Sequence, residues 1–98
     1  MTDRELLELA AKAAGIRLHV WGTPNCENFA DLDTGNRWNP LRDDGDALRL
    51  AVKLNLFNGA EVYHFRSLER FGRQDEDDLA ATRRAIVRAA AEIGRQHD

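Results

Sequence analysis

The pattern of apolar residues over the first twenty-two positions changes once, from helical spacing to strand-like alternation. This change constrains the fold more than any other feature. Apolar residues recur at helical spacing over residues 2–14, at Leu6, Leu9, Ala10 and Ala13. Thr2 and Glu5 form a capping-box pattern, and Gly15 stands where helices commonly end in a left-handed residue. Residues 16–22, "IRLHVWG", then alternate between apolar and polar, which predicts a half-buried strand.

The middle of the chain predicts a loop, an extended segment and a second helix. Residues 23–28, "TPNCEN", are typical of a loop, and residues 29–40 predict a second strand or a small hairpin turning at residues 34–36. Asp43 or Asp44 should open a helix. Its expected core stripe is Ala47, Leu50, Ala51 and Leu54, with Arg49 and Lys53 toward water. Leu48 and Val52 widen the apolar arc, which suggests cover on more than one side.

The last third predicts one strand and one helix. Residues 60–68, "AEVYHFRSL", alternate over the best strand pattern in the chain. A helix is expected to start within residues 75–78 and to run to about Ile93, stopped by Gly94, with residues 95–98 as a frayed tail. Its expected buried stripe is Leu79, Ile86, Ala90 and Ile93, with Val87 beside it. The predicted fold is therefore an α+β domain over residues 1–98: a small α/β/α sandwich, ordered α-β-β-α-β-α, with about three mainly antiparallel strands and helices on both faces.

Length and charge exclude several classes of protein. Ninety-eight residues make one domain, and a net charge of -3 argues against a general binder of duplex nucleic acid. No run of 18 apolar residues is present, so no membrane span is expected. Met1 leads directly into polar residues, so no secretory signal is expected either. Cys26 is the only cysteine, which excludes an internal disulfide and fits a reducing cytosol.

The aspartates of "DLDTGN" and "DDGD" suggest calcium at first sight. An EF-hand loop needs glycine at position six and glutamate at position twelve. Counted from Asp31, these positions are Asn36 and Arg42, so the motif fails. A looser oxygen-ligand site is the weaker alternative to helix capping, and no metal site is predicted.

No catalytic set emerges from the nucleophilic residues, and no cofactor is predicted. Cys26 could pair with His19 or His64, but no family signature surrounds it. The three histidines and the cysteine also lack the spacing of zinc ligands.

Aromatic residues with nearby arginines are the best candidates for ligand contact. The hypothetical ligand-binding residues are Trp21, Arg37, Trp38, Arg42 and Arg66. Tryptophan stacks on bases and arginine pairs with phosphate, so a nucleotide or another small anion would suit this set. The favoured alternative is that Trp38 and Phe29 fill the core. Arg83, Arg84 and Arg88 on the last helix face either an acidic partner or, as we favour, water.

Two segments, "WNPLRDDGDALRLAVKL" and "ATRRAIVRAAAEIG", resemble the phage ABA sandwich domain family, small proteins encoded in phages and prophages. The resemblance extends over residues 2–94. It implies a helix–sheet–helix sandwich and action in the cytoplasm of an infected bacterium, and it carries over no site residue.

Several functional classes are compatible with these features. We favour a non-enzymatic, phage-encoded binding protein that counters a host defence by sequestering a nucleotide immune signal, acting as a sponge. Such a small chain is expected to form a homo-oligomer, because a pocket between subunits is easier to build. The alternatives are an inhibitor that blocks a host defence protein, or a phage accessory protein of unknown role. An enzyme ranks last.

Overall fold

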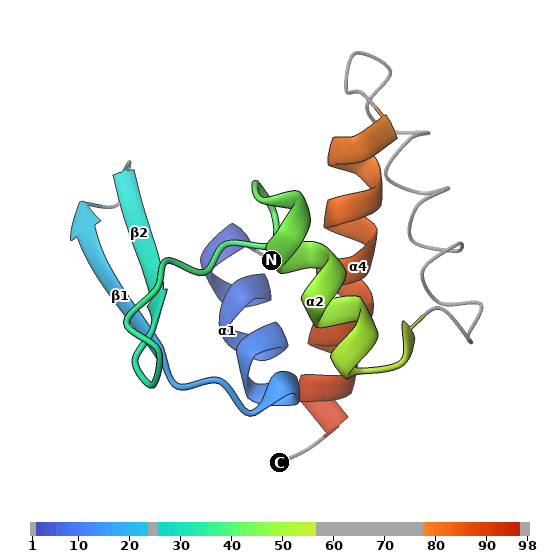
Figure 1. The fold of residues 1–98 in the computed structure, drawn as a ribbon, viewed down its shortest axis with the longest axis horizontal. Helices are drawn as coiled ribbons and strands as arrows, with labels where there is room; N and C mark the ends of the chain where they lie inside the picture. The colour runs from blue at the N-terminus through green and yellow to red at the C-terminus, as the bar shows by residue number, and fades with distance from the viewer. Residues whose placement is uncertain (1, 24–25, 57–77, 97–98) are drawn as a thin grey trace.

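The computed structural model describes residues 2–23, 26–56 and 78–96. They form α1 (Asp3–Ala14), β1 (Leu18–Thr23), β2 (Cys26–Asp31), α2 (Asp44–Lys53) and α4 (Asp78–Gln96). Three helices with one antiparallel two-stranded sheet confirm the α+β class (Figure 1). The strand predicted over residues 60–68 lies outside the described residues. Among the described helices, none is long and apolar enough to cross a membrane.

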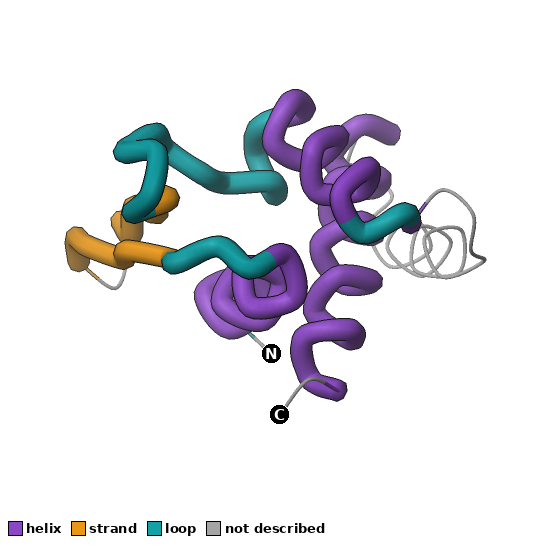
Figure 2. Tube along the Cα trace, turned by 60° about the horizontal axis from the view of Figure 1, so that its bottom comes forward, coloured by secondary structure: helices purple, strands orange, loops and turns teal. Residues whose placement is uncertain are grey.

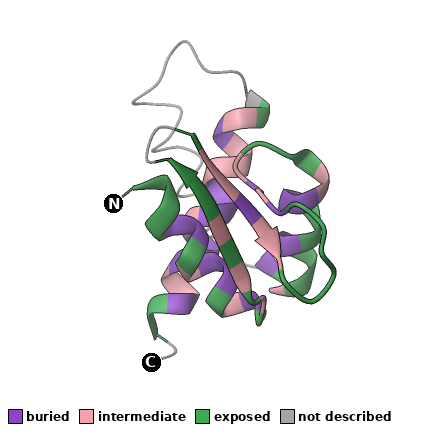
Figure 3. Ribbon diagram, turned by 90° about the vertical axis from the view of Figure 1, so that its left-hand side faces the viewer, coloured by how far each residue is buried: buried purple, intermediate pink, exposed green. Residues whose placement is uncertain are grey.

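The three helices pack together, and the β1–β2 hairpin lies along one side of them (Figure 2). Exposed positions follow β1 and the loop after β2, while buried positions gather on the helices behind (Figure 3). In the part of the chain described, helices therefore cover one face of the sheet, not both as predicted.

Both predicted ends of α1 are confirmed. The Thr2 side chain accepts a hydrogen bond from the Glu5 backbone N–H at 3.1 Å, and Gly15 caps the other end with a φ of 72°. The buried face is rotated slightly from the prediction, because it consists of Leu6, Leu7, Ala10, Ala11 and Ala14. Leu7 thus takes the central place expected for Leu9, since this is the face that packs against α4.

The connection between β1 and β2 is shorter than the loop predicted over residues 23–28. Thr23 pairs with Cys26, so only two residues separate the strands, and residues 26–28 belong to β2 instead of a loop. Cys-Glu-Asn is a poor strand sequence, and its pairing with β1 overrides that local preference.

After β2 the chain reverses where the sequence predicts. The Gly35 N–H donates to the Asp31 carbonyl at 2.8 Å, and the Trp38 N–H donates to the Phe29 carbonyl at 3.0 Å. Trp38 and Phe29 are both buried in the core, which confirms the favoured alternative for these two rings.

Helix α2 starts and packs as expected, but its second apolar side is open. Asp43 is the N-cap, and Ala47, Leu50 and Ala51 are buried. Leu48 and Val52 are 55% and 63% exposed, so no described residue provides the cover expected over them.

Helix α4 differs from its prediction at both ends. Leu79 is 62% exposed, whereas Ile86, Val87 and Ala90 are buried as predicted. At the other end the helix continues past Gly94 to Gln96, so the glycine does not stop it, and residues 95 and 96, predicted to belong to a frayed tail, are helical. Gly94 is buried where the backbone of Leu9 crosses α4, and a side chain there would collide with it.

Two arginines of α4 join the helices to one another. Arg83 donates to the Leu41 carbonyl at 3.0 Å and pairs with Asp44 on α2 at 2.6 Å. Arg84 pairs with Asp3 on α1 at 3.0 Å. Both arginine side chains are less than one-fifth exposed. The expectation of a solvated arginine face is therefore wrong for Arg83 and Arg84.

Loss of the α2 cap gives a first testable effect. Asp43 Oδ1 accepts the Asp46 backbone N–H at 3.0 Å. Asp43→Ala is expected to lower the free energy of unfolding by about 1 kcal/mol, because that N–H loses its acceptor. Urea titration followed by circular dichroism measures it. Asp43→Asn keeps an acceptor and should remain within a few tenths of the parent, and equal losses for both variants would contradict the capping role.

Candidate functional site

A pocket of about 830 Å³ lies between α2 and the loop that follows β2. The loop leaves β2, runs away from the helices and returns at the start of α2 (Figure 2). The end of α1 and the connection to β1 close one side of the pocket. Its lining consists of Ala14, Ile16, Asp31, Thr34, Asn36, Arg37, Trp38, Asn39, Arg42, Asp43, Asp46, Arg49, Leu50 and Lys53.

The three carboxylates of the lining are occupied by hydrogen bonds within the chain. Asp31 accepts the Asp33 backbone N–H, and Asp43 caps α2. Asp46 pairs with Arg49 at 2.6 Å. These acids are therefore structural, and they hold the walls of the pocket in place.

Three cations of the lining have no carboxylate partner among the described residues. Arg37, Arg42 and Lys53 form no ion pair with any residue that the structure describes, and the side chains of all three are exposed. Arginine and lysine without a carboxylate partner beside a pocket are suited to bind phosphate or another small anion.

Asp46 fixes the position of the loop that carries two of these cations. It is only 8% exposed, and its Oδ2 accepts the Asn39 backbone N–H at 3.0 Å. The Asn39 side chain in turn accepts the Leu41 N–H at 3.1 Å. Residues 39–41 are thus tied to α2, which sets where Arg37 and Arg42 stand at either end of them.

The structure brings together three of the five predicted ligand residues. Arg37, Trp38 and Arg42 line the pocket. Trp38 is 7% exposed, so it forms part of the floor and offers little ring surface for stacking. Trp21 lies on the outer face of the hairpin, 39% exposed and stacked on His19 at 5.3 Å. Arg66 lies outside the described residues.

Three charged residues on α2 also line the pocket and were not predicted as ligand contacts. Asp46, Arg49 and Lys53 follow one another at spacings of three and four, which places them on one face of α2. Arg49 and Lys53 are exposed as expected, but the water they face is the opening of the pocket. The spacing was visible in the sequence, whereas the loop that faces it was not.

The other chemical groups considered from the sequence lie apart. Cys26 is exposed at the turn end of the hairpin, four strand positions from Ala30, which pairs with His19. His64 lies outside the described residues. In the parts of the chain that are described, no three His, Cys, Asp or Glu side chains gather in a way that could hold a metal ion.

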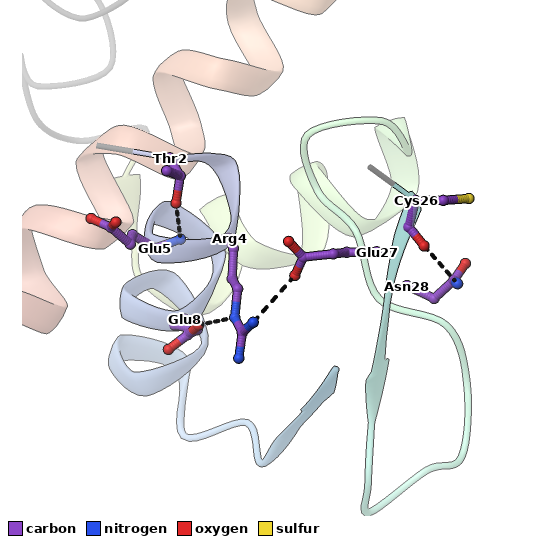
Figure 4. Close-up of polar contacts among 7 residues, drawn as sticks. All are labelled: Thr2, Arg4, Glu5, Glu8, Cys26, Glu27 and Asn28. Atoms are coloured by element: carbon purple, nitrogen blue, oxygen red, sulfur yellow. Dashed lines mark hydrogen bonds and ion pairs between the residues drawn. The ribbon is translucent and has the colours of Figure 1, made fainter. Parts of the chain in front are cut away.

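A second polar cluster joins α1 to the hairpin (Figure 4). Arg4 Nε bonds Glu8 Oε1 at 2.7 Å, and Arg4 Nη1 lies 3.6 Å from Glu27 Oε2. The hydrogen bond to Glu8, with the charges of both glutamates, raises the pKa of Arg4. Glu27 Oε2 is buried without a hydrogen bond, so the ion pair with Arg4 is what compensates it.

Comparison with known proteins adds no relative: no family model, no curated protein and no solved structure matches the chain.

Proposed function

We propose that the protein is a non-enzymatic binder of a small anionic ligand, of the nucleotide class, held in the pocket between α2 and the loop after β2. The observation that carries the proposal is the set of three exposed cations, Arg37, Arg42 and Lys53, around one pocket with no ion-pair partner in the described residues.

The size and chemistry of the pocket agree with this class of ligand. Its volume of about 830 Å³ falls in the range of small-molecule sites. The carboxylates of the lining are hydrogen-bonded within the chain, which leaves its exposed cations to contact an anionic ligand. Anionic groups would pair with the cations, and the apolar part of the ligand would lie against Ile16, which is half-buried at the wall of the pocket.

The biological setting is part of the same proposal. The resemblance to the phage ABA sandwich family suggests a phage protein that sequesters a nucleotide immune signal in the host bacterial cytoplasm. The third strand over residues 60–68 and the full sandwich belong to this proposal too. A single chain already has a pocket of suitable volume, so binding does not require the proposed homo-oligomer.

Calorimetric titration tests the proposal. The full chain is titrated with cyclic dinucleotides and with isomers of cyclic ADP-ribose, and the ligand that binds is then used with the variants Arg42→Ala and Lys53→Ala. Each variant loses one charge-assisted contact with the ligand, so affinity should fall by about tenfold or more for each.

Arg95→Ala is the matched control, because Arg95 is an exposed arginine near the end of α4 that pairs with Glu92 and does not line the pocket. It should bind as the parent does. If no nucleotide binds, the nucleotide class is wrong. If a nucleotide binds but Arg42→Ala and Lys53→Ala leave its affinity unchanged, the pocket is wrong.

A further inference from the structure

Arg49 differs from the other cations of the proposed ligand pocket, because a carboxylate in the described part of the chain holds it. Its Nη2 lies 2.6 Å from Oδ1 of Asp46, three residues earlier on α2. The Arg49 side chain is 73% exposed and lines the pocket, whereas the Asp46 side chain is only 10% exposed. The pair therefore joins a buried carboxylate to a cation at the opening of the pocket.

The position of the Arg49 guanidinium is defined from two sides. Asp46 accepts its hydrogen bond, and a Cβ added at Gly45 would lie 3.3 Å from both Nη1 and Nη2. The guanidinium therefore lies against the first turn of α2, where glycine leaves room for it. A guanidinium has five N–H donors, and Arg49 gives one to Asp46 and none to any other described residue. Its remaining donors can contact a ligand in the pocket.

The same carboxylate also holds the loop that forms the other wall of the pocket. Asp46 Oδ2 accepts the Asn39 backbone N–H at 3.0 Å, while Oδ1 accepts from Arg49. Asn39 lies between Arg37 and Arg42 in the chain. Asp46 therefore sets the position of the α2 cation relative to the two cations of the loop.

The charges of the whole lining make the role of Asp46 testable by the sign of its effect. The charged lining residues are Arg37, Arg42, Arg49, Lys53, Asp31, Asp43 and Asp46. Removal of the negative charge of Asp46 makes the pocket more positive, so Coulomb attraction alone should strengthen the binding of an anion. If Asp46 instead serves to position Arg49, its removal should weaken that binding.

We propose that Arg49 is a further ligand-binding residue of this pocket and that Asp46 is the residue that positions it. This inference rests on the proposed function, because the ligand is the same small anion. Arg49 contacts a phosphate or phosphodiester group of the ligand through the donors that Asp46 leaves unused. Asp46 holds the guanidinium in place before the ligand binds, so less side-chain freedom is lost on binding.

Calorimetric titration of the full chain with inorganic pyrophosphate and with cyclic dinucleotides tests the inference. Arg49→Ala should weaken binding by about tenfold. Asp46→Asn keeps one oxygen, which the half-buried Asn39 N–H requires, and turns its amide NH₂ toward Arg49. It should therefore weaken binding by about fivefold, the cost of ordering one long side chain. When Arg49→Ala is already present, adding Asp46→Asn should weaken binding no further, because only its charge effect is left.

Stronger binding in Asp46→Asn would overturn the inference, as would an equal loss with and without Arg49→Ala. Unchanged affinity in Arg49→Ala would overturn it too. If Arg42→Ala and Lys53→Ala still weaken binding in that case, the proposed function stands and only this inference fails. If the parent binds neither pyrophosphate nor a cyclic dinucleotide, the proposed function fails and this inference fails with it.

Glu92→Gln is the matched control for Asp46→Asn. Glu92 pairs with Arg95 at 3.1 Å over the same spacing on α4, outside the pocket, so this variant should bind as the parent does. A measurement on the parent alone covers the case in which Asp46→Asn does not fold. The ¹⁵N order parameter of the Arg49 Nε–H should exceed that of Arg42, which has no ion pair with a described residue. Equal order parameters would contradict the positioning role.

Discussion

Trp38→Ala is expected to lower the free energy of unfolding by about 3–5 kcal/mol, the largest effect of any substitution considered. The ring is 7% exposed and belongs to the main core cluster together with Phe29 and Leu50. Alanine would leave a cavity under the loop that carries Arg37 and Arg42, and the loop would lose its apolar anchor. Ligand affinity should therefore fall together with stability.

Denaturant titration measures the stability of this variant, and Trp21→Ala is the matched control. Trp21 is 39% exposed on the outer face of the hairpin and contacts His19 by ring stacking. Its removal should cost no more than about 1 kcal/mol. Similar losses for the two tryptophans would show that Trp38 does not fill the core.

Gly94→Ala is expected to lower the free energy of unfolding by about 2 kcal/mol, although alanine is the better helix former by about 1 kcal/mol. An added Cβ would lie 2.9 Å from the carbonyl carbon of Leu9 and closer still to its oxygen. Both atoms belong to the backbone of α1, so they can give way only if the two helices move apart.

Gly45→Ala provides the comparison, because it makes the same change in another helix. There the added Cβ would meet the Asp43 carboxylate and the Arg49 guanidinium at 3.2–3.3 Å. A shift of a few tenths of an ångström makes room, and we expect the Asp43 hydrogen bond to the Asp46 N–H to survive it. Thermal unfolding should show a lower midpoint for Gly94→Ala and an unchanged or slightly higher one for Gly45→Ala. Equal midpoints for both variants would mean that the contact between α1 and α4 tolerates a methyl group.

The two glycines that flank helices in the sequence illustrate how far local patterns reach. Gly15 and Gly94 both follow an apolar helical stripe, and both were predicted to end a helix. Gly15 does so, with a φ of 72°, whereas Gly94 lies inside α4. The difference is the position of Leu9, which is 85 residues earlier in the chain and therefore invisible to any local pattern.

The candidate site also contains some residues that the local sequence identified and others that it did not. Arg37, Trp38 and Arg42 were found from residue type, because they lie within six positions and share one loop. Lys53 and Arg49 were not, because a cation on the exposed face of a helix has the same pattern whether it faces bulk water or a pocket. Trp21 and Trp38 both stand near an arginine in the sequence, so residue type selected both as candidates. Only the structure shows that Trp38 is buried and Trp21 is exposed.

The sequence by itself determined the features that depend on neighbours in the chain: the Thr2 and Asp43 caps, the left-handed Gly15 and the alternation of β1. These follow from hydrogen bonds and side-chain periodicity within a few residues. The tertiary structure decided where β2 begins, why α4 continues through Gly94, and which cations surround one pocket. Each of these depends on a contact between segments distant in sequence, whose energy outweighs the local preference of the residues involved.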